Sequence, residues 1–398
     1  MFHALRRAAL LLLVLTGLRS QAVELGIDRL RTMDFAPLVG KRVGLVTNHT
    51  GTDSRGVKTR LILRNASGVN LAALFSPEHG LDGSAEAGRY VASRRDSVTG
   101  LTVYSLYGPT RKPTPDMLRG IDCLVYDMQD IGCRSYTYVS TMAKCMEATG
   151  EAGIEFVVLD RPNPLGGIRV EGPPMEARWI SFVGQLPVPY VHGMTVGELA
   201  RMANANGWTG ARCQLRVIEM RDWNRRMIWA DTGLRWIPTS PNIPRGTSPA
   251  YYVATGLAGE LGAIETACGT STPFEVFATR PGNSDSLLAF LRALSLPGVS
   301  LTPYVSDGYE GVRLKIDPRT TTNLTALGVY LLSHSNRISK PDLFARSSAS
   351  KLDLFYKCYG SQSIRDQLAR GIAVPRIVES WQRANERFEA ERGPFLLY

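Results

Sequence analysis

A glutamate and a histidine stand side by side where an apolar run of the chain stops. Residues 71–75 are uncharged and apolar, and the sequence Ser-Pro-Glu-His-Gly follows at 76–80. Such a run is typical of a buried strand, and Pro77 ends it because proline has no N–H group for the strand ladder. A carboxyl group beside an imidazole at a strand end is a candidate acid–base pair, so we take Glu78 and His79 as candidate catalytic residues. The structural alternative is that Glu78 caps the next turn and His79 fills a gap.

Three further predicted strands end in polar side chains. These strands cover residues 42–47, 121–128 and 154–159. Because ligands of open parallel sheets bind at the carboxyl ends of the strands, we expect all four polar clusters to line one shared cleft. The three additional clusters consist of Asn48 and His49, of Asp127 and Asp130, and of Asp160, Arg161 and Asn163.

The elements that must position these side chains form a βαβ pattern. Helices are predicted near 57–63, 136–148 and 195–204. Further strands are predicted at 101–106 and 215–220. We therefore predict an α/β protein whose residues 23–245 form a Rossmann-like, parallel-sheet catalytic domain. A Gly-x-Gly-x-x-Gly fingerprint for dinucleotides is absent. Residues 246–398 predict a smaller α/β domain, which we expect to pack over the cleft as a lid.

The first 22 residues read as a secretory signal peptide. Two arginines precede the apolar run 8–14, and Ser-Gln-Ala at 20–22 fits a cleavage site. We therefore expect an exported protein, periplasmic or secreted, without a stable membrane anchor. Removal of this segment takes away three arginines and lowers the net charge from +10 to +7. That charge favours anionic partners such as peptidoglycan, while no basic–aromatic pattern indicates nucleic-acid binding.

The cysteine spacing does not predict a metal site, and it leaves the disulfide state open. The six cysteines include no Cys-x-x-Cys pair, so a structural zinc site is not expected. An oxidising compartment would permit disulfides, and Cys133 with Cys145 or Cys268 is one option that the sequence leaves open.

Seven stretches of the chain resemble the NamZ-type exo-β-N-acetylmuramidases. They run in the family's order through nearly the whole mature chain, at 44–51, 75–80, 130–138, 160–164, 170–173, 192–198 and 240–244. The resemblance implies a Rossmann-like domain with a smaller C-terminal lid domain, and no cofactor. It also implies release of N-acetylmuramic acid from the non-reducing end of peptidoglycan fragments. In one loop the chain departs from the family: Glu-Thr-Ala-Cys-Gly-Thr-Ser at 265–271 stands where Ser-Glu-Gly-Arg-Gly-Thr-Thr is usual, so that an arginine suited to the lactyl carboxylate is missing.

The resemblance also assigns candidate roles to residues. Glu78 corresponds to the catalytic carboxylate, and we expect it to act as the acid, supported by His79. Glycoside hydrolysis usually needs a second carboxylate, for which Asp127, Asp130, Asp160 and Glu171 are open choices, unless the acetamido group of the sugar is the nucleophile. Residues expected to bind substrate are Asn48, His49, Asp130, Arg134, Tyr136, Arg161, Asn163, Glu171, His192 and Asn242.

Two other classes of function remain open at this point. A metal-dependent hydrolase would use His49, His79 and His192 with Asp127, although no His-Glu-x-x-His spacing supports it. A muropeptide-binding protein without catalysis would keep the cleft and lose the acid. Gly-x-Ser-x-Gly is absent, which disfavours a serine hydrolase.

Overall fold

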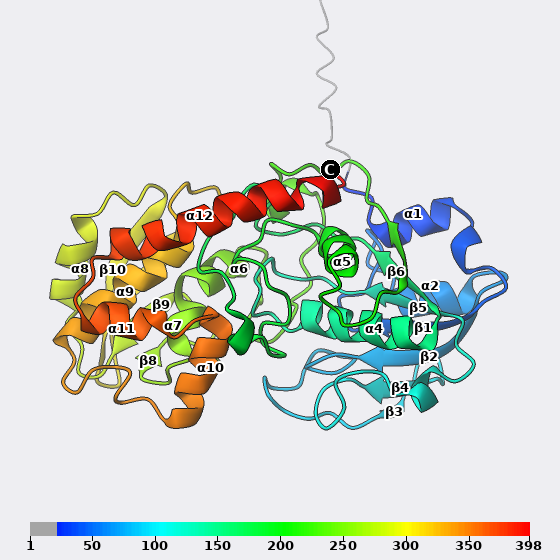
Figure 1. Cartoon of the computed structure of the whole chain (residues 1–398), viewed down its shortest axis with the longest axis horizontal. Coiled ribbons are helices and arrows are strands. Elements are labelled where there is room, and N and C mark those ends of the chain that lie inside the picture. Colours follow the sequence, from blue (N-terminus) through cyan, green and yellow to red (C-terminus); the bar gives the residue numbers. More distant parts are fainter. Residues whose placement is uncertain (1–21) are drawn as a thin grey trace, which may run out of the picture.

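The computed structural model describes residues 22–398 and contains two sheets in two halves of the molecule (Figure 1). The predicted signal peptide, apart from its last residue Ala22, lies outside the described residues. No helix within 22–398 is both long enough and apolar enough to cross a membrane.

The N-terminal half is built on a seven-stranded sheet with the strand order β3-β4-β2-β1-β5-β6-β7. All neighbouring strands run parallel except the β3–β4 pair at one edge. The central strands are buried because both of their faces are covered, which explains their continuous apolar runs. The strands are β1 (Arg42–Thr47), β2 (Asn70–Ser76), β3 (Arg94–Arg95), β4 (Thr102–Ser105), β5 (Cys123–Asp127), β6 (Glu155–Leu159) and β7 (Gln214–Ile218).

Helices connect these strands and cover the sheet. The best defined is α5, where Thr195 and Glu198 form the predicted capping box: the hydroxyl accepts from the Glu198 N–H, and the carboxylate accepts from the Thr195 N–H. The mixed α/β fold with a mostly parallel sheet is thus confirmed. The helices are α1 (Gly26–Thr32), α2 (Thr59–Asn65), α3 (Pro115–Leu118), α4 (Tyr138–Ala152) and α5 (Val196–Ala205), with 3₁₀ turns at Ala36–Leu38, Ala177–Trp179 and Trp229–Asp231.

The C-terminal half contains a smaller antiparallel sheet with the order β10-β11-β9-β8. Its strands are β8 (Ile264–Glu265), β9 (Val276–Thr279), β10 (Val299–Ser306) and β11 (Tyr309–Ile316). A broken helical segment leads into it, consisting of α6 (Ser248–Tyr251), a π-helical turn (Tyr252–Gly256) and α7 (Leu257–Gly259). The remaining helices are α8 (Ser284–Arg292), α9 (Leu324–Ile338), α10 (Ala349–Tyr359), α11 (Ser363–Ala369) and α12 (Val374–Arg392), with a 3₁₀ turn at Gly393–Phe395.

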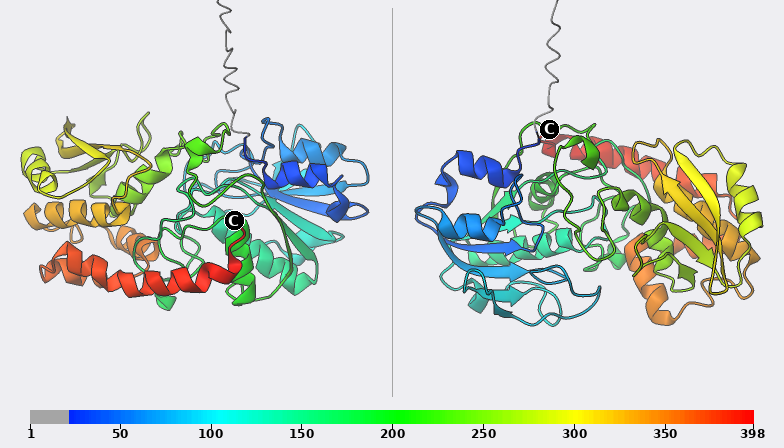
Figure 2. Two further views of the ribbon diagram at one scale, coloured as in Figure 1. Left: turned by 90° about the horizontal axis from the view of Figure 1, so that it is seen from above. Right: turned by 180° about the vertical axis from the view of Figure 1, so that it is seen from behind.

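The C-terminal half is not attached through residues 246–250 alone. Helix α12 runs back toward the N-terminal half and brings the end of the chain close to α5 (Figure 2). There the Tyr398 hydroxyl donates to Asp160 at 2.8 Å and accepts from the Met220 N–H at 2.8 Å. The Arg201 guanidinium also binds the carbonyl of Phe395. The predicted lid domain is therefore tied to the Rossmann-like domain at both of its ends.

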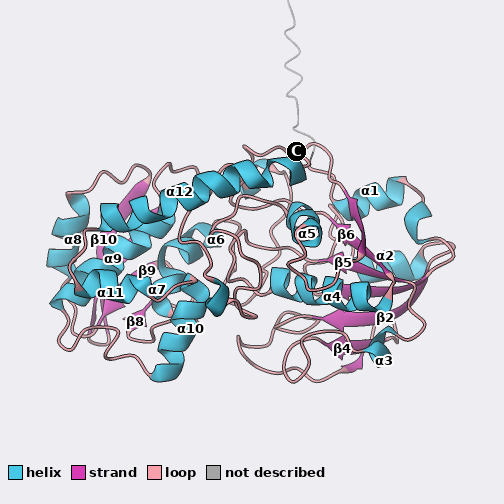
Figure 3. Ribbon diagram, in the orientation of Figure 1, coloured by secondary structure: helices cyan, strands magenta, loops and turns pink. Residues whose placement is uncertain are grey.

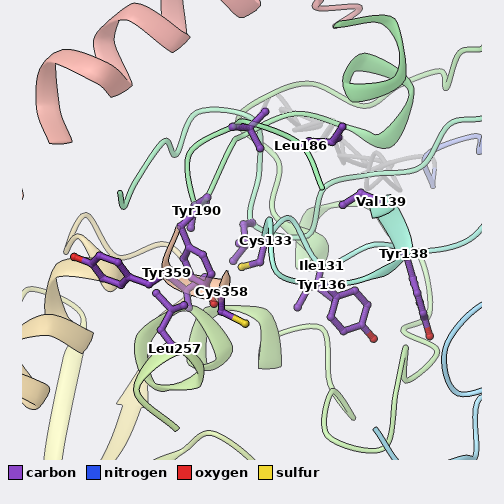
Figure 4. Packing of buried hydrophobic residues seen from close by; sticks show 14 of the residues in the cluster. Ile131, Cys133, Tyr136, Tyr138, Val139, Leu186, Tyr190, Leu257, Cys358 and Tyr359 are labelled. Carbon is purple, nitrogen blue, oxygen red and sulfur yellow. The ribbon is translucent and has the colours of Figure 1, made fainter. Parts of the chain in front are cut away.

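The two halves share one hydrophobic core. Figure 4 shows Cys133 and Tyr190 of the N-terminal half beside Leu257, Cys358 and Tyr359 of the C-terminal half. Much of the region between the two sheets consists of loops, as Figure 3 shows, and these include the segments that follow the parallel strands. The carboxyl end of the sheet consequently faces the C-terminal half.

Candidate active site

A cavity of about 540 Å³ lies between the two halves and takes lining residues from both. Its size is in the range of small-ligand sites. The N-terminal half contributes the loop after β2, the residues just before α4 and the segment 240–243, and the C-terminal half contributes the segment from the π-helical turn to Glu260, the 264–268 loop and α10. The polar and aromatic lining residues are Glu78, His79, Tyr107, Ser135, Tyr136, Thr137, Ser240, Asn242, Tyr252, Glu260, Glu265, Thr266, Cys268, Phe274, Lys351 and Cys358.

Glu78 is held in this cavity by two donors. The Gly88 N–H donates to one carboxylate oxygen at 2.8 Å, and the Thr137 hydroxyl donates to the other at 2.6 Å. Tyr107 also lines the cavity, and burial, followed by the nearby negative charge of Glu78, raises its pKa well above its usual range. The side chain is 8% exposed, so it is fixed in orientation yet open to the cavity.

His79 adopts a backbone conformation that is uncommon for residues other than glycine. Its φ is 68°, and Gly80 follows with φ 75°, so the chain turns sharply after β2. The imidazole Nδ1 is 2.6 Å from the carbonyl oxygen of Ala85. This contact holds the loop that carries Gly88 back toward Glu78, and the His79 side chain itself lines the cavity.

A second carboxyl group of the cavity, Glu260, was missed by the sequence analysis. It follows α7, and the same helical segment lines the cavity with Tyr252, Gly256 and Gly259. Burial raises the pKa of Glu260; the nearby Lys351 ammonium opposes this rise, and the negative charge of Glu78 adds to it. Glu78 and Glu260 thus come from different halves of the molecule and line the same cavity.

Lys351 is the one lysine or arginine among the described lining residues of this cavity. It lies on α10 and forms no ion pair within 22–398. Glu265 is the third acid of the lining, but its carboxylate accepts from the N–H of Ala267 and so holds its own loop. Glu78 and Glu260 are thus the two carboxyl groups of the cavity that do not hold their own loop, and they share it with one lysine side chain.

Two predicted substrate-binding residues lie at this cavity. The Tyr136 hydroxyl donates to Thr239 at 2.8 Å, and its ring packs edge-on against Tyr138 and Tyr252. Asn242 accepts from the Gly269 N–H at 2.9 Å and thereby fixes the loop that differs from the family pattern. Both residues keep a surface toward the cavity.

The other predicted catalytic carboxylates do not line this cavity. Asp127 is fully buried, binds the Arg161 guanidinium at 2.6 Å and accepts from the Thr59 hydroxyl. Asp160 accepts from Thr195, from the Gly197 N–H and from Tyr398, and burial raises its pKa to about 7. In this structure Asp127 joins strand ends, and Asp160 anchors α5 and the C-terminus.

The four polar clusters therefore do not share one cleft, because most of their members hold loops. Asp130 accepts from the Gly132 N–H, and burial raises its pKa to about 7. Asn163 bonds to the backbone of Leu165 and Met194. Asn48 accepts from the N–H and hydroxyl of Thr50. His49 and Arg161 line a different cavity.

Arg134 and Glu171, which we expected to bind substrate, join the two halves of the molecule instead. Arg134 is 1% exposed and donates to four backbone carbonyls, of Pro173, Val188, Cys358 and Tyr359. Burial lowers its pKa to about 10. Glu171 pairs with Arg169 and accepts from the Thr325 N–H at the start of α9.

The histidines of the alternative metal site make separate contacts. His49 Nε2 contacts the Pro238 carbonyl, and His79 contacts Ala85. His192 is buried elsewhere, where its Nδ1 accepts from the Met194 N–H; burial, and then the charges of Arg392, Arg134 and Arg225, lower its pKa to about 3. Within 22–398 no three His, Cys, Asp or Glu side chains are grouped as metal ligands would be. All six cysteines are unpaired.

The cavity between the two halves, called the candidate catalytic cavity below, is suited to acid–base chemistry on a small polar ligand. One of its carboxyl groups is fixed by hydrogen bonds, and the other holds a proton more readily than usual because it is desolvated and faces a negative charge. Glycoside hydrolysis requires such a pair, one group to protonate the leaving oxygen and one to act on the opposite side.

Comparison with known proteins points to the same chemistry. Residues 43–247 match the family described as exo-beta-N-acetylmuramidase NamZ, N-terminal, and residues 250–398 match its C-terminal counterpart. Peptidoglycan beta-N-acetylmuramidase NamZ of Bacillus subtilis (strain 168) is 40% identical over 385 residues, which cover 94% of this chain and 91% of that protein.

Solved structures share the fold. A DUF1343 family protein from Bacteroides fragilis NCTC 9343 has a TM-score of 0.88 and 40% identity, covering 95% of this chain and 99% of its own. A second protein of that family and organism has a TM-score of 0.67 and 27% identity, covering 94% and 99%. From the two matched domains and the full-length relative, we conclude that the chain belongs to the NamZ family of exo-β-N-acetylmuramidases, a family of glycosidases.

Proposed function

We propose that this protein is an exported exo-acting glycosidase that releases N-acetylmuramic acid from the non-reducing end of peptidoglycan fragments, in the periplasm or outside the cell. The observation that carries the proposal is the pair Glu78 and Glu260, contributed by opposite halves to one cavity. The enzymatic activity of the B. subtilis relative supports the same substrate class.

We further propose a division of labour between the two carboxyl groups. From the sequence we expected Glu78 to be the acid. The surroundings support the reverse assignment, since burial and the charge of Glu78 raise the pKa of Glu260, while Glu78 receives hydrogen bonds on both of its oxygens. Glu260 would then protonate the leaving oxygen, and Glu78 would activate water or stabilise the developing positive charge of the sugar.

Lys351 is our proposed partner for the lactyl carboxylate of N-acetylmuramic acid. This carboxylate distinguishes the sugar from N-acetylglucosamine, and a cation is its natural partner. Lys351 is the one permanent cation among the described lining residues, and it stands beside Glu260. It would supply, from α10, the positive charge that the 265–271 loop lacks relative to the family.

The test is incubation of the mature protein with the disaccharide MurNAc-GlcNAc and with GlcNAc-MurNAc, with and without EDTA. We expect release of N-acetylmuramic acid from the first disaccharide alone, at a rate that EDTA leaves unchanged. Loss of turnover in EDTA would favour a metal-dependent hydrolase. Binding of MurNAc-GlcNAc without turnover would make the protein a muropeptide-binding protein.

A further inference from the structure

A second cavity, of about 440 Å³, lies in the N-terminal half and is not used by the proposed reaction. It is lined by the loop after β1, by Gln129 after β5 and by the segment 234–238. In the sheet order β1 and β5 are neighbours, with β2 beyond β1 and β6 beyond β5. The chain continues from β1 to β2 on one side and from β5 to β6 on the other, so the connections after β1 and β5 run in opposite directions. Open α/β sheets bind ligands at such a switch point, outside the carboxyl ends of the strands.

The charge of this cavity is predominantly positive. Four cations line it, Arg55, Lys58, Arg161 and Arg235, against one acid, Asp53. Arg161 is neutralised by Asp127 at 2.6 Å, and Asp53 is bound by Arg31 at 2.8 Å with Arg55 at 3.5 Å. Lys58 and Arg235 have no acidic partner within 4.0 Å among residues 22–398. Lys58 is partly buried; burial, and then the charge of Arg60, lower its pKa, and the charges of Asp82 and Asp96 oppose this shift.

Apolar and aromatic residues also line the cavity. They are Leu25, Leu234 and Ile237 together with Trp229 and Trp236, whose ring centroids lie 4.7 Å apart in an edge-to-face arrangement. Tryptophan faces pack well against the C–H faces of sugar rings, while cations hold a phosphate or carboxylate. Three lining residues, His49, Gln129 and Trp229, also have a buried polar atom without a partner within the described chain.

The wall between the two cavities is a single segment. Trp236, Ile237 and Pro238 line the second cavity, whereas Ser240, Asn242 and Ile243 line the candidate catalytic cavity. The middle of this segment is fixed by Tyr138, whose hydroxyl donates to the Thr239 carbonyl at 2.6 Å. The two cavities are therefore separate sites, and a ligand in one does not occupy the space of the other.

We propose that the switch-point cavity is a second binding site, for an anionic monosaccharide, with Lys58 and Arg235 holding the anionic group and the tryptophan wall packing on the sugar ring. The anion is a phosphate or a carboxylate, two chemistries that the same cations accept. The proposal is independent of the glycosidase function, because it uses none of the residues of the candidate catalytic cavity.

The experiment is calorimetric titration of the mature protein with glucose 6-phosphate, glucuronic acid, glucose, inorganic phosphate and uridine monophosphate. We expect one site for at least one of the two anionic sugars, and much weaker binding of glucose and of inorganic phosphate. The double variant Lys58→Met/Arg235→Met should weaken this binding by roughly tenfold or more, since each charge-assisted hydrogen bond typically contributes that much. Arg64→Met removes an exposed charge from the same region and should change nothing.

Several results would overturn the proposal. The proposal fails if neither glucose 6-phosphate nor glucuronic acid binds. It also fails if inorganic phosphate binds as tightly as the anionic sugars, because the cavity would then hold an adventitious ion only. Tighter binding of uridine monophosphate would reject the sugar assignment. Loss of binding in Lys351→Met, with Lys58→Met/Arg235→Met unaffected, would place the anionic sugar in the candidate catalytic cavity. Thermal melting of each variant ensures that folded proteins are compared.

Discussion

At the scale of single residues, the environments of two carboxyl groups determine the proposed chemistry. Glu78 is oriented by Gly88 and Thr137, whereas burial, and to a smaller extent the charge of Glu78, raise the pKa of Glu260. Two carboxyl groups whose environments differ in this way can take different roles in acid–base catalysis.

Glu260→Gln tests which group is the acid. An acid matters most when the leaving group is poor, so the variant should lose roughly 10² to 10⁴ in kcat on MurNAc-GlcNAc. It should lose far less on the 4-nitrophenyl glycoside of N-acetylmuramic acid, whose leaving group needs no proton. Glu265→Gln is the matched control in the same cavity and should retain activity on both substrates. If instead Glu78→Gln kept its activity on the 4-nitrophenyl glycoside and lost it on the disaccharide, while Glu260→Gln lost activity on both substrates, Glu78 would be the acid.

Lys351→Met tests recognition of the lactyl carboxylate. Because Lys351 is the permanent cation of the described cavity lining, we expect KM for the N-acetylmuramic glycoside to rise by about tenfold, with a smaller change in kcat. Any residual hydrolysis of the corresponding N-acetylglucosamine glycoside should be unaffected, since that sugar has no carboxylate. An equal loss on both glycosides would show that Lys351 supports the fold or the chemistry rather than the specificity.

At the scale of elements, the buried Arg134 joins the loop after β5 to the end of α10. It donates to carbonyls of both halves, at Val188 on one side and at Cys358 and Tyr359 on the other. Arg134→Met leaves these carbonyls unpaired, and we expect a loss of about 3 to 5 kcal/mol in the free energy of unfolding. Urea unfolding followed by circular dichroism measures it.

The control for Arg134 is another arginine that joins the two halves. Arg319 pairs with Asp231 at the surface, where an ion pair typically contributes about 0 to 1 kcal/mol, so Arg319→Met should have little effect. Similar losses in both variants would contradict the role assigned to Arg134.

The elements also show what the sequence can and cannot predict. The apolar strands 42–47, 70–75 and 154–159 and the capping box of α5 were predictable because burial and capping leave local patterns. The sequence could not show which polar residues at the strand ends stabilise loops and which line the cavity. That depends on partners far apart in the chain, such as Tyr398, which donates to Asp160. Glu260 was missed for the same reason: its importance lies in facing Glu78, and its only local signal is the glycine-rich turn before it.

At the scale of the whole molecule, burial of ionisable groups makes stability depend on pH. His192 is neutral in the fold, since burial and neighbouring arginines lower its pKa to about 3, below the unfolded value of 6.5. Below pH 6.5 the unfolded chain therefore binds the extra proton, and stability falls as the pH drops toward 3. Asp130 and Asp160, with pKa values raised to about 7, act in the opposite sense between pH 3.8 and 7.

His192→Gln isolates the contribution of the histidine, because both aspartates are present in the variant and in the wild type. When the pH is lowered from 6.5 to 5, the free energy of unfolding should fall by about 2 kcal/mol more in the wild type than in the variant, at about 1.4 kcal/mol per pH unit. Urea unfolding at the two pH values gives both numbers. A parallel decline of the two proteins would contradict a buried neutral His192.

The central claim, that Glu78 is a catalytic carboxylate of a cavity formed by both halves, is tested most directly by Glu78→Gln. The measurement is kcat for release of N-acetylmuramic acid from MurNAc-GlcNAc, for wild type and variant, with the melting temperature recorded in parallel. Glutamine keeps the shape and removes the charge, so we expect kcat to fall by roughly 10² to 10⁴ with the fold intact. A folded variant whose kcat stays within about threefold of wild type would contradict the account.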